Sequence, residues 1–157
     1  MGMPTRVVAM DMELRGDIFL EGWLVTAFVR YAPFGGYFGG RKIPAFAYDE
    51  IAVGVGAGQR VALGEIGVVD LSIAPELVVM EEEGDVPADG TAGSDDEMRL
   101  VATARLVLTR SPWHPTLTLD AEIAPFAAAH PAIADVNLPS LPTWTAGLRV
   151  GIARDFL

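Results

Sequence analysis

The stretch that decides the fold runs from Met98 to Leu108 and reads MRLVATARLVL. Apolar residues occupy every second position, and Arg99, Thr103 and Arg105 stand between them. A repeat of two residues is the period of a β-strand, because successive side chains of a strand point to opposite faces. The stretch therefore predicts a strand with one apolar face and one polar face.

The same alternation covers most of the chain. It predicts seven strands, over residues 8–14, 18–31, 45–63, 67–80, 98–108, 116–123 and 143–152. Short turns are expected at 15–17, 63–65 and 111–115, and long loops at 33–42, 81–97 and 127–142. Such sorting of turns to one end and loops to the other is typical of outer-membrane barrels. We therefore predict an all-β fold, an up-and-down antiparallel β-barrel of about eight strands with seven visible in the sequence, as a single domain over residues 1–157.

Composition restricts the class of protein. Hydrophobic residues make up 51% of the 157 residues and the mean hydropathy is +0.35, yet no window approaches the roughly 18 apolar residues of a membrane-spanning helix. That combination leaves either a large buried β core or a barrel whose outside faces lipid. The chain has no cysteine, which excludes disulfides and thiolate metal sites. The formal net charge is −10 and eight of the acids lie in residues 81–97, so we expect no nucleic-acid partner.

The polar faces of successive strands carry opposite charges. From the strand at 67–80 onward, the order is acid, base, acid, base. Unpaired charges would be prohibitive inside a narrow barrel, so we expect these rows to pair across its lumen. The candidate lumen ion-pair network consists of Glu50, Arg60, Asp70, Glu76, Arg99, Arg105, Asp120, Glu122 and Arg149. Gly54, Gly56 and Gly58 would leave room for arginines that reach across from neighbouring strands. The alternative is that the charged rows form the solvated outer face of an ordinary antiparallel sheet.

Catalytic motifs have no support in the sequence. His114 and His130 each stand beside a proline in different connections, and no serine–histidine–aspartate set can be assembled around them. The glycines of residues 54–58 lack the spacing of a nucleotide-binding loop, and the acids of residues 81–97 lack the spacing of a calcium loop. We therefore expect no enzymatic activity, no cofactor and no bound metal.

In its alternation, sorted connections and charged polar rows, the chain resembles the small outer-membrane β-barrel proteins of Gram-negative bacteria, the OmpA/OmpX-like class. The resemblance covers about residues 5–157 and includes a last strand, 145–152, that ends near the aromatic Phe156. It implies a lipid bilayer as partner, an outer-membrane location and a structural or surface-interaction role, with residues 81–97 as an acidic outer loop whose partner is unknown. Because that class has an even number of strands, either the first strand is missing from the sequence or the count of seven is wrong. A chain cut within an outer loop would explain both the odd count and the absence of a visible signal peptide.

A second class of protein fits the same alternation. In a soluble barrel of the lipocalin or avidin type, the apolar rows would face inward and bind a small apolar ligand, while the charged rows would face water. The two hypotheses differ in which face carries Leu106, Leu119, Leu148 and Val150. An oligomer that completes a seven-stranded sheet is left open by the sequence.

Overall fold

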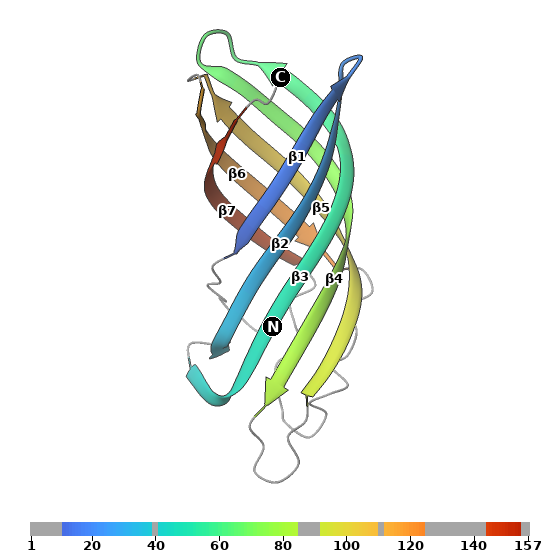
Figure 1. Cartoon of the computed structure of the whole chain (residues 1–157), viewed down its shortest axis with the longest axis vertical. Coiled ribbons are helices and arrows are strands. Elements are labelled where there is room, and N and C mark those ends of the chain that lie inside the picture. Colours follow the sequence, from blue (N-terminus) through green and yellow to red (C-terminus); the bar gives the residue numbers. More distant parts are fainter. Residues whose placement is uncertain (1–10, 39–40, 85–91, 110–111, 125–143, 155–157) are drawn as a thin grey trace, which may run out of the picture.

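The chain forms one antiparallel sheet of seven strands that curls into an open half-barrel (Figure 1). This computed structural model describes residues 11–38, 41–84, 92–109, 112–124 and 144–154. The strands are β1 (Met12–Leu20), β2 (Trp23–Phe38), β3 (Arg41–Ala62), β4 (Gly67–Gly84), β5 (Ala92–Leu108), β6 (His114–Ile123) and β7 (Trp144–Ala153). Each strand pairs with the next one in the sequence, which confirms the predicted all-β, up-and-down antiparallel fold. Within these ranges no helix is long and apolar enough to cross a membrane.

The first turn lies six residues later in the chain than predicted. Arg15, Gly16 and Asp17 belong to β1 and pair with β2, so the prediction of a turn at 15–17 was wrong. The turn falls at Glu21 and Gly22, whose φ angles are 46° and 89°. Two positive φ angles make the two-residue hairpin turn whose twist matches that of the flanking strands. The longer hairpin pairs all of β1 with β2 and places Asp17 on the sheet.

The β3–β4 turn lies where the sequence predicts it, whereas the β5–β6 connection lies between Leu108 and His114, so the turn predicted at 111–115 was wrong at His114 and Pro115. The Leu63 amide donates a hydrogen bond to the Gly67 carbonyl across the β3–β4 turn, at 2.9 Å. The Thr109 amide, just after β5, donates to the Ile66 carbonyl at 3.0 Å and so links the two neighbouring turns. The three connections β1–β2, β3–β4 and β5–β6 lie at one end of the half-barrel, at the top of Figure 1. We refer to this end as the turn end.

At the opposite end, strands replace two of the predicted loops. β2 ends only at Phe38 and β3 begins at Arg41, so residues 33–38 and 41–42 are strand and not the predicted loop. β4 ends only at Gly84 and β5 begins at Ala92, so residues 81–84 and 92–97 are also strand, and the loop predicted at 81–97 was wrong there. There residues 81–83 of β4 lie opposite residues 47–49 of β3 and residues 92–94 of β5. The loop predicted at 127–142 lies outside the described residues.

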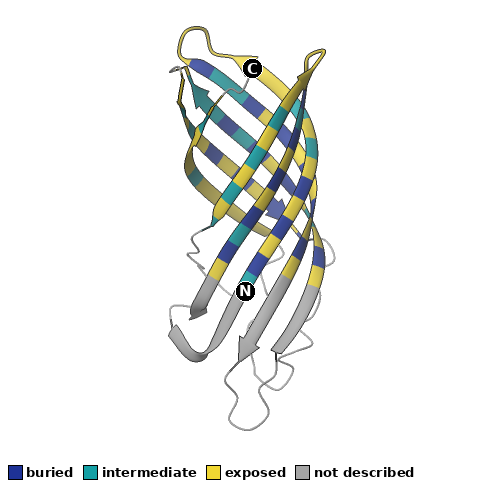
Figure 2. Ribbon diagram, in the orientation of Figure 1, coloured by how far each residue is buried: buried dark blue, intermediate teal, exposed yellow. Residues whose placement is uncertain are grey.

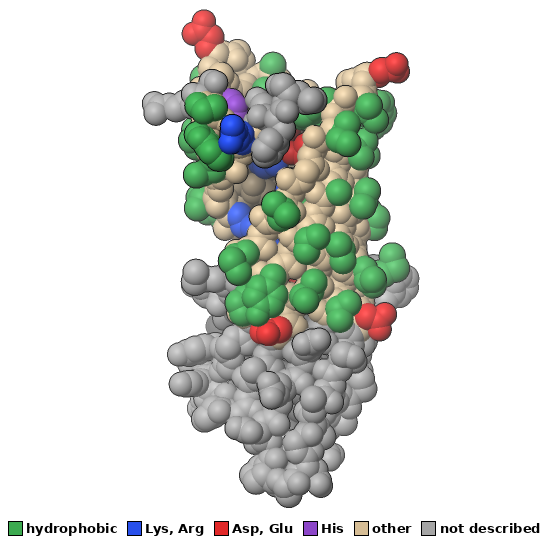
Figure 3. Space-filling view, in the orientation of Figure 1, with side chains coloured by type: hydrophobic (Ala, Val, Ile, Leu, Met, Phe, Trp, Pro, Cys, Tyr) green, Lys and Arg blue, Asp and Glu red, His purple; other side chains and the backbone are tan. Residues whose placement is uncertain are grey.

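Burial alternates along the strands (Figure 2). The buried positions carry most of the charged residues of the strands, and the exposed positions carry most of the large apolar residues. Asp70 and Glu76 are 2% and 1% exposed, whereas Leu14 and Val150 are 79% and 82% exposed. On the face seen in Figure 3, apolar side chains are spread over the outer surface of the described strands. The inner side also holds a small apolar group, Leu24, Phe28, Val78 and Val101. Of the four residues that separate the two hypotheses, Leu119, Leu148 and Val150 are exposed and Leu106 is half-buried.

Candidate functional site: an interior network of ion pairs

The register of the sheet lines up charged side chains in a row near the turn end. Arg60, Asp70, Arg105, Thr118 and Arg149 are successive partners across β3 to β7. Two guanidinium nitrogens of Arg60 donate to the two carboxylate oxygens of Asp70, at 2.6 and 2.9 Å. Arg105 donates to Asp70 from the other side at 2.9 Å. Asp70 is therefore fully buried between two arginines, which compensates the loss of its hydration.

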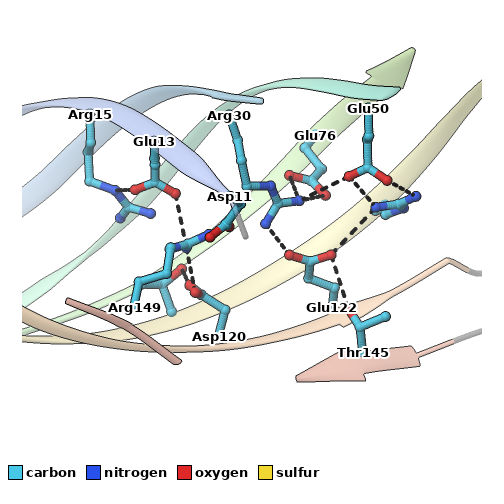
Figure 4. Close-up of polar contacts among 12 residues, drawn as sticks. Asp11, Glu13, Arg15, Arg30, Glu50, Glu76, Asp120, Glu122, Thr145 and Arg149 are labelled. Carbon is cyan, nitrogen blue, oxygen red and sulfur yellow. Dashed lines mark hydrogen bonds and ion pairs between the residues drawn. The ribbon is translucent and has the colours of Figure 1, made fainter. Parts of the chain in front are cut away.

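Arg30 lies at the centre of a second cluster (Figure 4). Its guanidinium donates to both oxygens of Glu76, at 2.9 and 3.1 Å, and also to Glu122. Glu50 lies 3.7 Å from the same guanidinium. Arg30 stands on β2, whereas Glu76 and Glu122 stand on β4 and β6, so this one side chain links strands that are not neighbours in the sheet.

Arg99 on β5 completes this cluster. It donates to both carboxylate oxygens of Glu50 on β3, at 2.8 Å each, and also pairs with Glu97. Glu122 lies 3.6 Å from it. Glu50 and Glu122 are thus shared between Arg30 and Arg99, and the four charges hold each other in place.

The third cluster links the two edge strands. Arg149 on β7 lies 2.8 Å from Asp11 and 2.9 Å from Glu13, at the start of β1, and pairs with Asp120 on the neighbouring β6. Glu13 also accepts a hydrogen bond from Arg15 at 2.7 Å. These contacts connect β1 to β7 through side chains alone.

All nine residues predicted for the network lie on the inner side of the sheet, and each of them takes part in at least one ion pair. Six further charged residues join them: Asp11, Glu13, Arg15, Asp17, Arg30 and Glu97. Arg15 and Asp17 were missed because they were assigned to a turn, and Glu97 because it was assigned to a loop. Alternation in the strand predicted at 18–31 does place Arg30 on the polar face, although the predicted network does not include it.

The three glycines of β3 do not make room for arginines, as the sequence had led us to expect. A Cβ atom at Gly54 would overlap the ring of Phe28, which covers this position. Arg15 in turn lies over that ring, at 5.1 Å from its centre. Gly56 and Gly58 bring β3 close to the backbone of β4, where any side chain would clash. The glycines therefore serve close packing of strands and of one aromatic ring.

The chemistry available in the described interior is ionic and hydrogen-bonding. His114 contacts the Leu108 carbonyl at 3.1 Å near the turn end, and His130 lies outside the described residues. In the described ranges, no group of three or more histidines, cysteines and acids is placed to hold a metal ion. What the arrangement provides is a charged, ion-paired inner surface enclosed by an apolar outer one.

Comparison with known proteins identifies no relative. No family model, no curated protein and no solved structure matches the chain.

Proposed function

We propose that this chain is an outer-membrane β-barrel protein with a structural or surface-interaction role, whose outer face contacts lipid. The observation that carries the proposal is the inversion of the usual burial pattern: leucines, valines and isoleucines are exposed, while aspartates, glutamates and arginines are buried. Charged residues are almost never fully buried in soluble proteins unless they are paired, and large exposed apolar surfaces mark interaction sites. Membrane barrels have this apolar-out, polar-in alternation.

The interior supports the proposal in a second way. Moving a charge out of water costs several kcal/mol, and ion pairing at best compensates that cost. A soluble sheet would avoid the cost by turning Asp70, Glu76 and Arg30 toward water. In a bilayer the outer face of the sheet contacts hydrocarbon, which cannot solvate charge. Charged side chains must therefore lie on the inner face and form ion pairs.

The tryptophans mark two levels on the outer face. Trp23, Trp113 and Trp144, the three in the chain, are all more than half exposed. The first two lie at the turn end and Trp144 at the opposite end of β7. Ala153, at the turn end of β7, pairs with His114 next to Trp113. Nine residue steps separate Trp144 from Ala153, a rise of about 23 Å for a strand tilted by about 40°. Membrane barrels have an apolar band of roughly 25 Å between their aromatic girdles.

The surface-interaction part of the proposal rests on the end opposite the turns. The strands β2 to β5 extend furthest there, and the parts of β4 and β5 at that end include the acids Glu81, Glu82, Glu83, Asp95 and Asp96. The alternative of a soluble barrel with a small apolar ligand requires apolar rows that face inward. The described rows face outward, and no observation favours that alternative.

Lipid contact is tested with quenching by brominated lipids. The chain has no cysteine, so a fluorophore attached to Leu119→Cys on β6 reports from one site on the outer face. Thr109→Cys, exposed beyond the end of β5, is the matched control. In vesicles we expect strong quenching at residue 119 and weak quenching at residue 109. A chain that is monomeric in detergent-free buffer, with equal quenching at both sites, would refute the proposal.

A further inference from the structure

The open side of the half-barrel lies between β1 and β7. No backbone ladder joins these two strands, and neither has a partner on its outer edge among the described residues. Exposed strand edges are templates for pairing with another strand. We propose that this seam accepts one further β-strand, supplied by a separate polypeptide, that is apolar on its outer face and basic on its inner face. This inference depends on the geometry of the sheet and not on whether its outer face contacts lipid.

Ion pairs cross the seam as they cross strands within the sheet. Arg30 on β2 reaches Glu76 on β4 across β3, at 2.9 Å, and Arg99 on β5 reaches Glu50 on β3 across β4, at 2.8 Å. Arg149 on β7 makes contacts of the same kind with β1, at 2.8 and 2.9 Å. One arginine side chain therefore bridges the seam, as Arg30 and Arg99 each bridge an intervening strand.

Strand direction also favours an inserted strand. The strands alternate in direction, so β1 and β7, the first and last of seven, run the same way. Direct pairing of β1 with β7 would be the one parallel ladder in an antiparallel sheet. A strand that runs from the turn end toward the opposite end pairs antiparallel with both edges, as the rest of the sheet does.

The inner face of the missing strand is specified by charge. Among the residues whose side chains the structure describes, the inner side carries nine carboxylates and six arginines: Asp11, Glu13, Asp17, Glu50, Asp70, Glu76, Glu97, Asp120 and Glu122 against Arg15, Arg30, Arg60, Arg99, Arg105 and Arg149. One oxygen of Asp17 on β1 is buried without a hydrogen-bond partner. A basic residue on the inserted strand opposite Asp17 would satisfy that oxygen and reduce the excess of acid.

Small residues beside the seam leave space for the inserted strand. On the inner side of β7, a Cβ atom at Gly147 would meet nothing closer than 4.0 Å. In the sheet, Arg30 crosses β3 to reach Glu76, and its neighbour on β3 is the small residue Ala52. The inserted strand is therefore expected to carry glycine or alanine where Arg149 crosses to Glu13.

A second copy of the chain does not fit the seam equally well. Two half-barrels closed edge to edge would form a cylinder of twice as many strands, and barrel diameter grows roughly in proportion to strand number. The ion pairs that cross the interior, Arg30 with Glu122 and Arg105 with Asp17, require a narrow barrel. They would be lost in such a cylinder.

The test uses a synthetic strand and the full chain, in whichever solvent the chain is monomeric. The peptide has about nine residues, with apolar outward positions, arginine opposite Asp17, glycine opposite Glu13 and one outward cysteine. It is incubated with chains that carry Leu14→Cys on β1 or Val150→Cys on β7. The matched control is Val55→Cys, equally exposed on the outer face of β3 but paired on both sides. Disulfide yield and peptide affinity are measured.

We expect the peptide to form disulfides with both edge variants and not with Val55→Cys. Replacing its arginine by glutamate should weaken binding about tenfold, the effect of losing one charged hydrogen bond. Equal yields at all three sites, absence of cross-linking at either edge, or equal binding of the glutamate peptide would overturn the proposal. A disulfide formed without peptide, in a chain that carries both edge cysteines, would also overturn the proposal. A disulfide within one chain would show that β1 pairs directly with β7, and a disulfide between two chains would show that copies of the chain complete each other.

Discussion

The clearest consequence of the network concerns the carboxylate of Glu76. Its side chain is fully buried, and both hydrogen bonds that it accepts come from Arg30. Arg30→Met keeps the length of the side chain but leaves this carboxylate buried without a donor. Removal of one partner from a buried pair costs about 3–5 kcal/mol. The other two carboxylates near Arg30 add less, because Glu50 and Glu122 keep their contacts with Arg99.

The measurement is the free energy of unfolding in urea, followed by tryptophan emission of the chain refolded in lipid vesicles or in detergent. Arg60→Met is the matched control. Arg60 is 35% exposed, and its partner Asp70 keeps a second arginine, Arg105. We expect that control to cost about 1 kcal/mol or less. Adding Glu76→Gln to Arg30→Met should recover part of the loss, because it removes the stranded charge. Equal costs for the two arginine variants would refute the reasoning, as would a double variant less stable than Arg30→Met alone.

Three further substitutions test the sheet, its outer face and its first turn. Gly54→Val should lower the free energy of unfolding by about 1–3 kcal/mol, since the ring of Phe28 fills the space, and by less in a Phe28→Ala background. Leu119→Arg should cost about 2–4 kcal/mol in vesicles if the middle of β6 contacts hydrocarbon; a change within about 0.5 kcal/mol would show that the site faces water. Glu21→Asn should raise the unfolding free energy by roughly 0.5–1 kcal/mol, because asparagine adopts the positive φ of this turn more readily; no gain would mean that the turn is unstrained.

The face on which each strand residue lies was predictable, because side chains two residues apart on a strand point to the same face. Once Arg99 is placed on the inner side, Arg105 must follow, since an even number of steps separates them. The same parity holds for Asp120 with Glu122 on β6. Nine network residues could therefore be named from the sequence.

The boundaries of the strands were less predictable. Residues 15–17, a glycine between two charged residues, have the composition of a turn, yet they lie within β1. The true turn begins with Glu21, and glutamate is not among the residues that typically begin such a turn. Because register depends on turn position, misplacing the turn also concealed the roles of Arg15 and Asp17.

Which charges pair could not be read from the sequence for a further physical reason. Arg30 on β2 and Glu122 on β6 stand four strands apart, as do Asp17 on β1 and Arg105 on β5. In a flat sheet, four strand spacings would separate each pair by about 19 Å. Both pairs are in contact because the sheet curls. These contacts therefore measure the curvature of the sheet, which alternation alone does not encode. Closure of the half-barrel and pairing of its interior charges therefore depend on the same curvature. A strand that holds β1 and β7 at their present separation would also hold every ion pair across the interior in place.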